Sequence, residues 1–588
     1  MFGLSGLDPT LQQPRLGWIR FCARLDAEVE LEEGFLNDPG GTWGRLANPN
    51  ALSLADLASE PCVVLLGEPG LGKTIALEQE EARLRAAGGT VDRIDLRGYD
   101  TGTDLGTRMF RSQCWQEWQK GSYQLTLILD AVDESPLPSN TLVRVVLDGL
   151  RTADLTRLVL RIACRHGAWP PAFEQGLADR FGRTPRELLY KLLPLRMADV
   201  KEAATHRGFD GDGFVAEVVR RGVGPLASIP ITLDMLLRIY AEGQTLPKMR
   251  SEIYRRGLLT LCEEPDVARR HELERGATGL RLTAEQLFRV AARIATYTTL
   301  GGHTAISRWG SPHEVSGADF LLSSSAGGNE RVGEQQVLVD ENALGQSLRT
   351  ALFVPVGGER YRWGHRTFAE FLSASYLAPR PPEQLRGVVV MADDDGPYIT
   401  PQLREVAGWL VDLRPELFEL LLPSDPFVVL KGAAALGEPA RERLVEALLQ
   451  RFEEVSWDEY WDLWHSFANL HHAGLVTQLT RGAEDRGVSA IRRRVALEIA
   501  EQCRLKEMEP LWLRIALDPA ESEEVRLEAA GAIVRVGSDD AKARLAPLAR
   551  GEAGPDPNDE LRGLGLRAVW PRHWGAAEVL DHLTPPRN

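Results

Sequence analysis

The feature that most constrains the fold is a short apolar run that passes directly into a glycine-rich turn. Residues 62–66 read CVVLL and residues 67–74 read GEPGLGKT. An apolar run of this length bounded by turn residues is typical of a strand buried on both faces. Residues 75–87, IALEQEEARLRAA, have helical spacing. We therefore expect a strand, a tight turn and a helix, the start of a parallel α/β sheet.

Three further runs extend the predicted sheet. Residues 125–129 read LTLIL, and weaker strand patterns occupy 91–96 (VDRIDL) and 157–163 (RLVLRIA). Stretches with helical spacing separate these runs, and alternation of strands and helices favours a parallel sheet. The sequence predicts an α/β domain over residues 56–195.

The glycine-rich turn matches the pattern G-x-x-x-x-G-K-[ST] in full. Its members are Gly67, Glu68, Pro69, Gly70, Leu71, Gly72, Lys73 and Thr74. Glycines let successive backbone N–H groups point at one anion, the lysine brings a charge to the β and γ phosphates, and the hydroxyl is a ligand for Mg²⁺. We expect these residues, with Ile75, to bind ATP or ADP together with Mg²⁺.

Acidic residues follow the run at 125–129. Asp130, Asp133 and Glu134 stand where that strand ends, and ligands of open α/β sheets bind at the carboxyl ends of strands. We expect Asp130 to be the second Mg²⁺ ligand, directly or through water, and Glu134 or Asp133 to orient the attacking water. The alternative is a plain acidic exit from the strand. Arg165 is a candidate for γ-phosphate contact or a solvated loop residue.

The remainder of the chain predicts three more regions. Residues 196–280 carry helical segments that end at glycines, which is typical of a helical domain. Residues 281–384 combine helices with two short strands around a Gly-Gly turn, which suggests a winged helix, and residues 322–336 are expected to be a mobile loop. Residues 385–588 have no strand signal and indicate a HEAT-like α-solenoid.

The evidence for the solenoid is a loose repeat of amphipathic segments. Its period is near 30 residues, with the markers Arg404, Lys431, Arg494, Arg526 and Arg562. The aromatic stripe Trp457, Trp461 and Trp464 fits the solenoid core or a ligand-binding groove. The run Arg492–Arg494 is expected on a solvated helix face, with nucleic-acid contact as the alternative. The spacing of His465, His471 and His472 does not secure a metal site.

Composition narrows the class of protein. A chain of 588 residues allows about three to five structural units. The net charge of −16 argues against a chain-wide surface for nucleic acid or an anionic membrane. Six scattered cysteines and the lack of a signal pattern favour a soluble cytoplasmic protein with no membrane partner.

The motifs together resemble those of a known family. GEPGLGKT, LILDAVDE and ACRHG, in that order, are similar to the NACHT group of STAND NTPases, which are relatives of the AAA+ fold. Ala131 matches the small residue that follows the Mg²⁺ aspartate in that group. The resemblance implies that Pro230 of SIPITL packs on the adenine, although Ser228 replaces the usual glycine and a helix-start proline is the alternative. It also implies that His365 of WGHRTFAEFL contacts the β phosphate; without it, His365 reads as a structural residue.

The resemblance implies a switch that turns over ATP slowly. ADP would hold a closed state, and a protein or peptide trigger sensed by the C-terminal repeats would allow exchange for ATP and self-oligomerisation. Several prokaryotic members serve in antiphage defence. Residues 1–55 contain no recognisable effector, so we expect a separate effector protein. Two alternatives remain: an AAA+ remodeller that hydrolyses ATP continuously, and a repeat scaffold with a structural nucleotide.

Overall fold

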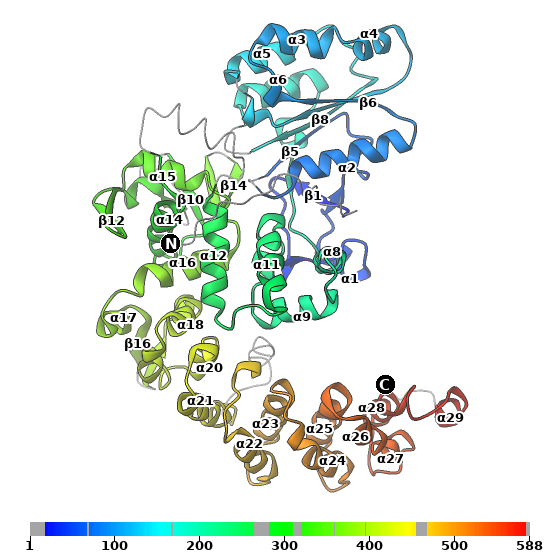
Figure 1. The fold of residues 1–588 in the computed structure, drawn as a ribbon, viewed down its shortest axis with the longest axis vertical. Coiled ribbons are helices and arrows are strands. Elements are labelled where there is room, and N and C mark those ends of the chain that lie inside the picture. Colours follow the sequence, from blue (N-terminus) through cyan, green and yellow to red (C-terminus); the bar gives the residue numbers. More distant parts are fainter. Residues whose placement is uncertain are drawn as a thin grey trace. The chain divides into compact units, whose positions relative to one another are not determined.

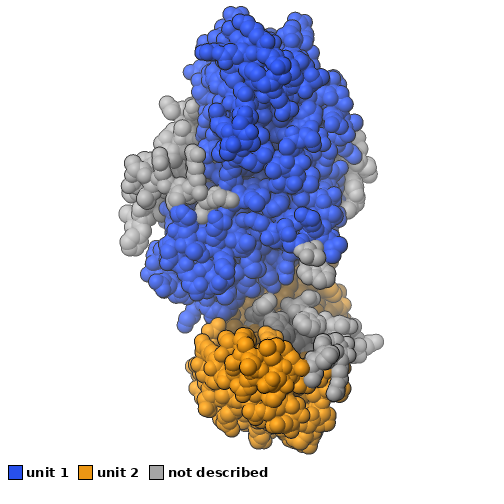
Figure 2. Space-filling model, turned by 90° about the vertical axis from the view of Figure 1, so that its right-hand side faces the viewer, with its two compact units in different colours: residues 1–376 blue, residues 377–588 orange. Residues whose placement is uncertain are grey.

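A computed structural model describes most of the chain. The described residues are 18–67, 70–135, 137–165, 169–263, 281–309, 319–357, 359–393, 396–453 and 467–583. They belong to two compact units, residues 1–376 and 377–588 (Figure 2). Glu68 and Pro69 of the turn, the three tryptophans of the stripe and His465 lie outside the described residues. No helix within the described ranges has both the length and the apolar character needed to cross a membrane.

A seven-stranded sheet organises the first unit, in the order β4-β1-β9-β5-β8-β7-β6 (Figure 1). The five strands from β9 to β6 are parallel, which confirms the predicted parallel α/β sheet. Every residue of β5, β7 and β8 is buried, as their continuous apolar runs require. The strands are β1 (Phe21–Arg24), β4 (Leu52–Ser53), β5 (Cys62–Leu66), β6 (Thr90–Asp95), β7 (Leu125–Asp130), β8 (Leu158–Cys164) and β9 (Leu189–Leu192).

The sheet begins earlier in the chain than the predicted start at residue 56. β1 pairs antiparallel with both β4 and β9, so the N-terminal region supplies one edge of the same sheet. A run of three apolar residues, Phe21 to Ala23, is too short to stand out by periodicity. The same region also holds the two-stranded sheet β2 (Leu31–Glu32) and β3 (Phe35–Leu36), and helix α1 (Thr42–Ala47).

Helices cover both faces of the sheet (Figure 1). On one face, Trp115 and Trp118 pack with the inward side chains of β5, β7 and β8. On the other face, Leu77 of α2 packs against Ile128 and Ala163. The helices are α2 (Lys73–Ala86), α3 (Gly102–Phe110), α4 (Gln113–Lys120), α5 (Ser139–Leu150), α6 (Pro171–Phe181) and α7 (Pro185–Leu188).

The rest of the first unit is mainly helical. A four-stranded sheet, β11-β10-β15-β14, accompanies its later helices, and β14 and β15 form the predicted hairpin. The helices are α8 (Met197–His206), α9 (Gly211–Arg220), α10 (Gly224–Ala227), α11 (Pro230–Gly243), α12 (Arg250–Cys262), α14 (Ala284–Leu300), α15 (Glu341–Leu348) and α16 (Arg366–Leu377). The strands are β10 (Ala305–Ser307), β11 (Asp319–Leu321), β14 (Phe353–Gly357) and β15 (Arg360–Trp363).

The prediction of a loop over residues 322–336 was wrong. The segment contains a 3-10 turn (Leu322–Ser325) and the hairpin of β12 (Asn329–Val332) and β13 (Gln335–Leu338). Glu330 of β12 is buried, and its carboxylate accepts hydrogen bonds from Arg289 and Arg293 of α14. These tertiary ion pairs hold a segment whose serines and glycines suggested a loop.

The second unit is a series of helices, and a hairpin of β16 (Val390–Asp393) and β17 (Gly396–Ile399) follows its first helix, so the expectation of no strands after residue 385 was wrong. The helices α22 and α23, α24 and α25, and α27 and α28 pack in pairs, and α23, α25 and α28 pack in succession. The helices are α17 (Pro382–Val389), α18 (Arg404–Leu413), α19 (Phe418–Leu421), α20 (Pro426–Leu430), α21 (Glu438–Arg451), α22 (Leu475–Glu484), α23 (Ala490–Gln502), α24 (Glu509–Leu517), α25 (Glu523–Val536), α26 (Asp539–Ala543), α27 (Ala546–Ala549), α28 (Glu560–Val569) and α29 (Ala576–His582).

Two buried arginines define the register of these pairs. Arg493 donates Nε–H to the carbonyl of Ala483, and Arg526 donates Nε–H to the carbonyl of Ala516, each ten residues earlier. Arg493, rather than Arg494, is therefore the counterpart of Arg526, 33 residues along the chain (493 and 526). Arg493 is also 5% exposed, so it does not lie on a solvated helix face as expected.

Candidate functional site

The glycine-rich turn joins the end of β5 to the start of α2. Gly67 N–H donates to the carbonyl of Cys164 at the end of β8, at 3.3 Å. Gly70 and Gly72 have φ of +79° and +86°, a region that side chains disfavour. A Cβ on Gly70 would also lie 2.5 Å from Cγ2 of Ile231. The conformation and the space of the turn both require glycine here.

The turn places Lys73 and Thr74 at the first positions of α2. The Lys73 ammonium folds back over the turn and donates to the carbonyl of Gly67 at 2.5 Å. The Thr74 hydroxyl donates to Oδ1 of Asp130 at 3.3 Å. β8 lies between β5 and β7, so these two side chains reach each other across one intervening strand. The structure thus brings together the lysine, the hydroxyl and the carboxylate that the sequence singled out.

Two more donors hold Asp130 in place beside the Thr74 hydroxyl. Its residue is 1% exposed, Oδ2 accepts from Arg93 Nη2 at 2.8 Å, and Oδ1 accepts from the N–H of Ala131 at 2.9 Å. Arg93 comes from β6 and also donates to Glu78 of α2 at 3.0 Å. The motifs did not identify Arg93; the available signal was a basic residue inside a predicted strand. Ala131 has φ of +57°, which favours a small side chain after Asp130.

Asp133, Glu134 and Arg165 form a second charged group at the same edge. Arg165 contacts Oδ2 of Asp133 through Nε at 2.8 Å and Oε1 of Glu134 through Nη2 at 3.1 Å. Its own N–H donates to Oδ1 of Asp133 at 2.9 Å. The Arg165 side chain is 12% exposed, so the solvated-loop interpretation was wrong. Glu134 also lies 3.6 Å from Arg97, a neighbour that the sequence did not reveal.

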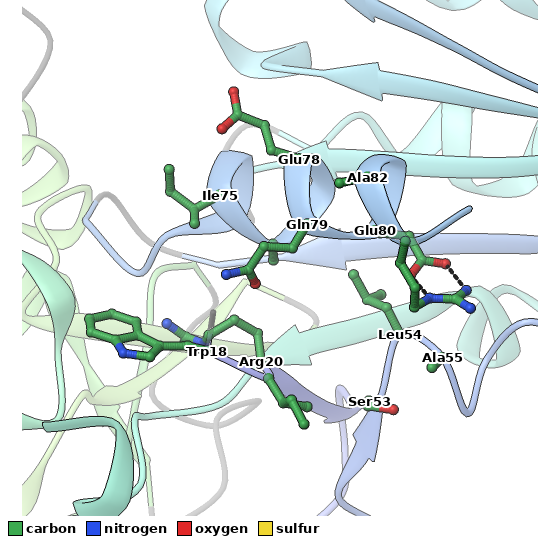
Figure 3. Close-up of a pocket in the computed structure, with 13 residues that line it drawn as sticks. Trp18, Arg20, Ser53, Leu54, Ala55, Ile75, Glu78, Gln79, Glu80 and Ala82 are labelled. Carbon is green, nitrogen blue, oxygen red and sulfur yellow. Dashed lines mark hydrogen bonds and ion pairs between the residues drawn. The ribbon is translucent and has the colours of Figure 1, made fainter. Parts of the chain in front are cut away.

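A cavity of about 470 Å³, which we call the first cavity, lies beside the first turns of α2. In Figure 3, Trp18 and Arg20 lie across it from Ile75 and Gln79. Arg20 donates to the carbonyl of Leu193 at 2.6 Å, and burial lowers its pKa to about 10. Trp18 and Arg20 were missed, because a tryptophan and an arginine before a three-residue apolar run form no recognisable motif.

A second cavity, of about 200 Å³, lies on another side of the turn. Leu71 of the turn lines it, together with Ser228 and Ile229 before α11 and His365 after β15. Pro230 is the first residue of α11, and its Cγ lies 3.7 Å from the position that a Cβ of Gly72 would occupy. Pro230 and His365 therefore both lie beside the turn.

His365 is a neutral hydrogen-bond donor in this position. Its Nδ1 accepts the backbone N–H of Thr367 at 3.2 Å, which leaves the proton of the neutral ring on Nε2. Burial lowers the pKa of His365 to about 4. The imidazole is therefore uncharged at neutral pH, and its Nε2–H remains to donate to a ligand.

Comparisons with known proteins add little to this geometry. No protein-family model and no curated protein matches the sequence. The Thermotoga maritima RuvB Holliday junction branch migration motor is similar at 16% identity over 36% of this chain and 67% of that chain, with a TM-score of 0.20. The Aeropyrum pernix ORC2 protein is similar at 12% identity over 67% of this chain and 98% of that chain, with a TM-score of 0.25. TM-scores this low support no inference about this chain.

Proposed function

We propose that the first unit binds ATP and hydrolyses it slowly at the carboxyl edge of its sheet. The observation that carries the proposal is the hydrogen bond between Thr74 and Asp130, beside the Lys73 ammonium. Mg²⁺ prefers hard oxygen ligands and is commonly held by one or two protein groups together with phosphate oxygens. A hydroxyl and a carboxylate at one point, next to a lysine at a helix N-terminus, fit that requirement.

On this proposal the residues at the carboxyl edge have separate roles in nucleotide binding and hydrolysis. Thr74 and Asp130 would hold Mg²⁺, which supplies charge to the phosphates, and Lys73 would exchange the Gly67 carbonyl for a phosphate oxygen. Asp133 is committed to Arg165 through two hydrogen bonds, and its side chain is 2% exposed. Glu134 is 18% exposed and is therefore better placed to orient a water molecule. Arg165 lies between them, where it can stabilise developing charge on the phosphate.

The first cavity is the proposed site for the base and ribose. It begins at the first turn of α2, next to the turn that would hold the phosphates, and Trp18 offers a flat aromatic surface. Arg20 Nη1 would lie 3.5 Å from a Cβ on Gly72, so this side chain links the cavity to the turn. Pro230 of α11 lies beside the same glycine, with Cγ 3.7 Å from that Cβ position.

We extend the proposal to a nucleotide-dependent switch of the NACHT and STAND type. Its support is the position of His365, whose Nε2–H can contact a phosphate only while the region after β15 stays beside the turn. On this proposal the helical repeats sense a protein or peptide trigger, and nucleotide exchange drives oligomerisation. A separate effector carries the response, and the proposed role is antiphage defence. A continuously cycling AAA+ remodeller fits the same edge geometry. ADP retained on a freshly purified monomer favours the switch, whereas rapid untriggered turnover favours the remodeller.

The direct test is nucleotide binding by Lys73→Ala, measured by calorimetry with ADP and with ATP and Mg²⁺. We expect a loss of about a hundredfold in affinity, because the variant lacks the ammonium that would bond the phosphates. Lys120→Ala, at the exposed end of α4, is the matched control. Wild-type affinity in Lys73→Ala would refute the nucleotide site.

A further inference from the structure

The second cavity carries positive charge that the proposed nucleotide contacts do not use. Among the described residues that line it, only Lys191 and Arg362 have charged side chains. His365 adds a neutral N–H donor to the same lining. Two cations and a neutral N–H donor on one cavity wall are suited to an anion.

Lys191 places one of these charges next to the glycine-rich turn. It lies on β9 and pairs with Leu66 of the parallel strand β5. Leu66 is the residue before Gly67, the first residue of the turn. Its ammonium donates to the carbonyl of Ala27 at 2.5 Å. An ammonium has three donors, so this contact leaves capacity for a ligand.

Arg362 brings the second charge from a distant segment. It lies on β15, where it pairs with Val354 of β14, and it is exposed. Burial and the nearby charge of Arg362 lower the pKa of Lys191, while the exposed carboxylates Asp26 and Glu28 raise it. The two cations therefore lie close enough to repel each other.

We propose that a phosphate group binds in the second cavity between Lys191 and Arg362, with Nε2–H of His365 as a third donor. A phosphate neutralises the repulsion and offers oxygens to all three donors. The volume of about 200 Å³ is far above the roughly 15 Å³ that one water requires. The group can be a terminal phosphate of the nucleotide, in which case the inference rests on the proposed function, or inorganic phosphate.

This binding would couple the ligand to the arrangement of the fold. Lys191 belongs to the seven-stranded sheet and Arg362 to the four-stranded sheet. With phosphate present, the charges attract a shared ligand and favour close approach of the two sheets. Without phosphate, their repulsion opposes that approach. The pair thus adds a ligand-dependent contact to the one made by His365.

The test compares Arg362→Gln and Lys191→Gln with wild-type protein, using the full chain. Arg349→Gln, an exposed arginine at the end of α15, is the control. Calorimetry with ADP, with ATP and Mg²⁺, and with inorganic phosphate alone separates the two sources. We expect each cavity variant to lose about tenfold in affinity for one of these ligands. Loss for nucleotide alone identifies a nucleotide phosphate, and loss for inorganic phosphate alone identifies a free one.

Wild-type affinity for every ligand in both cavity variants would overturn the proposal. A second measurement guards against misfolding: without ligand, Arg362→Gln should not lower the melting temperature, because it removes a repulsion. Lys73→Ala distinguishes this outcome from failure of the nucleotide site. Inorganic phosphate that still binds Lys73→Ala, and is lost in Arg362→Gln, supports the cavity site even where the turn binds no nucleotide.

Discussion

The two units both bury charged side chains, but those charges meet different partners. At the sheet edge, Lys73, Asp130 and Arg165 come from three separate segments and gather around the glycine-rich turn and the end of β7. In the helical unit, Arg493 and Arg526 end on backbone carbonyls or on a glutamate of the next helix pair. Burial of charge therefore marks a binding site only where the charged groups converge on space that a ligand can fill.

The helical unit uses its charges to join successive helix pairs. Arg493 donates to both carboxylate oxygens of Glu521, at 2.7 and 2.6 Å. Arg526 reaches further and donates to the carbonyls of Ala516, Ala553 and Pro555. Each arginine thus satisfies acceptors in its own pair and in the loop that joins the two helices of the next pair. Four substitutions can break or sharpen the contrast between the two units.

The largest effect is expected from Arg526→Met in the helical unit. The change leaves the buried carbonyl of Ala516 and the carbonyls of Ala553 and Pro555 without their donor, so we expect a loss of about 4 kcal/mol in opening free energy, with nucleotide binding unchanged. Hydrogen exchange of the α24, α25 and α28 amides measures that energy locally. Arg572→Met is the control, because its ion pair with Asp539 is 71% and 56% exposed. It should change stability by less than about 0.5 kcal/mol.

Glu498→Gln tests whether a buried charge in the helical unit is a structural cost. Burial, followed by the charges of Glu528 and Glu501, raises the pKa of Glu498 to about 9, above its unfolded value of 4.5. As pH rises from 4.5 toward 9, the unfolded chain loses this proton while the folded chain keeps it, so wild-type stability falls. The variant should gain on the order of 3 kcal/mol over wild type by pH 8 and nothing at pH 4.

The readout for Glu498→Gln is the pH dependence of amide exchange in α23 and α25. Glu507→Gln, in the exposed turn before α24, controls for the loss of one negative charge. A difference between Glu498→Gln and wild type that stays constant with pH would show that Glu498 is not held protonated in the folded state.

Glu134→Gln tests whether the carboxyl edge of the sheet catalyses ATP hydrolysis. Glutamine keeps the size of the side chain but cannot accept a proton, so ATP hydrolysis should fall about a hundredfold, equivalent to about 2.7 kcal/mol. Nucleotide affinity should stay within about twofold, because neither the phosphates nor Mg²⁺ depends on this carboxylate. Phosphate release and calorimetry give the two values, with Glu117→Gln on α4 as the control. A parallel loss of affinity would assign Glu134 to binding instead.

The smallest effect is expected from His365→Gln. The pKa of about 4 lies below the unfolded value of 6.5, so the unfolded chain binds a proton first as the pH falls. In the wild type, the contribution of neutral His365 to the free energy of unfolding is complete above pH 6.5 and declines as the pH falls toward 4. The variant should lack this decline, which amounts to about 2 kcal/mol at pH 5. Exchange of the α16 amides from pH 7 to pH 5 checks this, with His206→Gln at the exposed end of α8 as the control.

The sequence predicted the features that local pattern determines. The continuous apolar runs of β5 and β7 and the glycine pattern identified the sheet, the turn and the carboxylates at the end of β7. These signals are strong because a strand buried on both faces tolerates few polar residues, and because the turn needs glycine at positive φ. The proximity of Thr74 and Asp130 followed from the shared carboxyl edge of parallel strands.

The features that the sequence did not predict depend on tertiary contacts. Arg93 joins the site only because β6 lies next to β7, an order that the sequence does not state. Trp18 and Arg20 line the first cavity because β1 enters the sheet from outside the predicted domain. Arg493 and Arg494 are adjacent in sequence, and the carbonyl of Ala483 selects the first of them. Partners distant in the chain decide each of these roles.

The position of β8 between β5 and β7 fixes the distance between those two strands at the carboxyl edge of the sheet. Neighbouring strands are about 4.8 Å apart, so the turn strand and the strand of Asp130 are separated by about 10 Å. The side chains of Thr74 and Asp130 are long enough to meet across this separation. A glutamate at position 130 adds one carbon, about 1.5 Å, to a distance that the sheet does not adjust. Replacing Asp130 by glutamate preserves the charge but is therefore expected to misplace the carboxylate relative to Thr74.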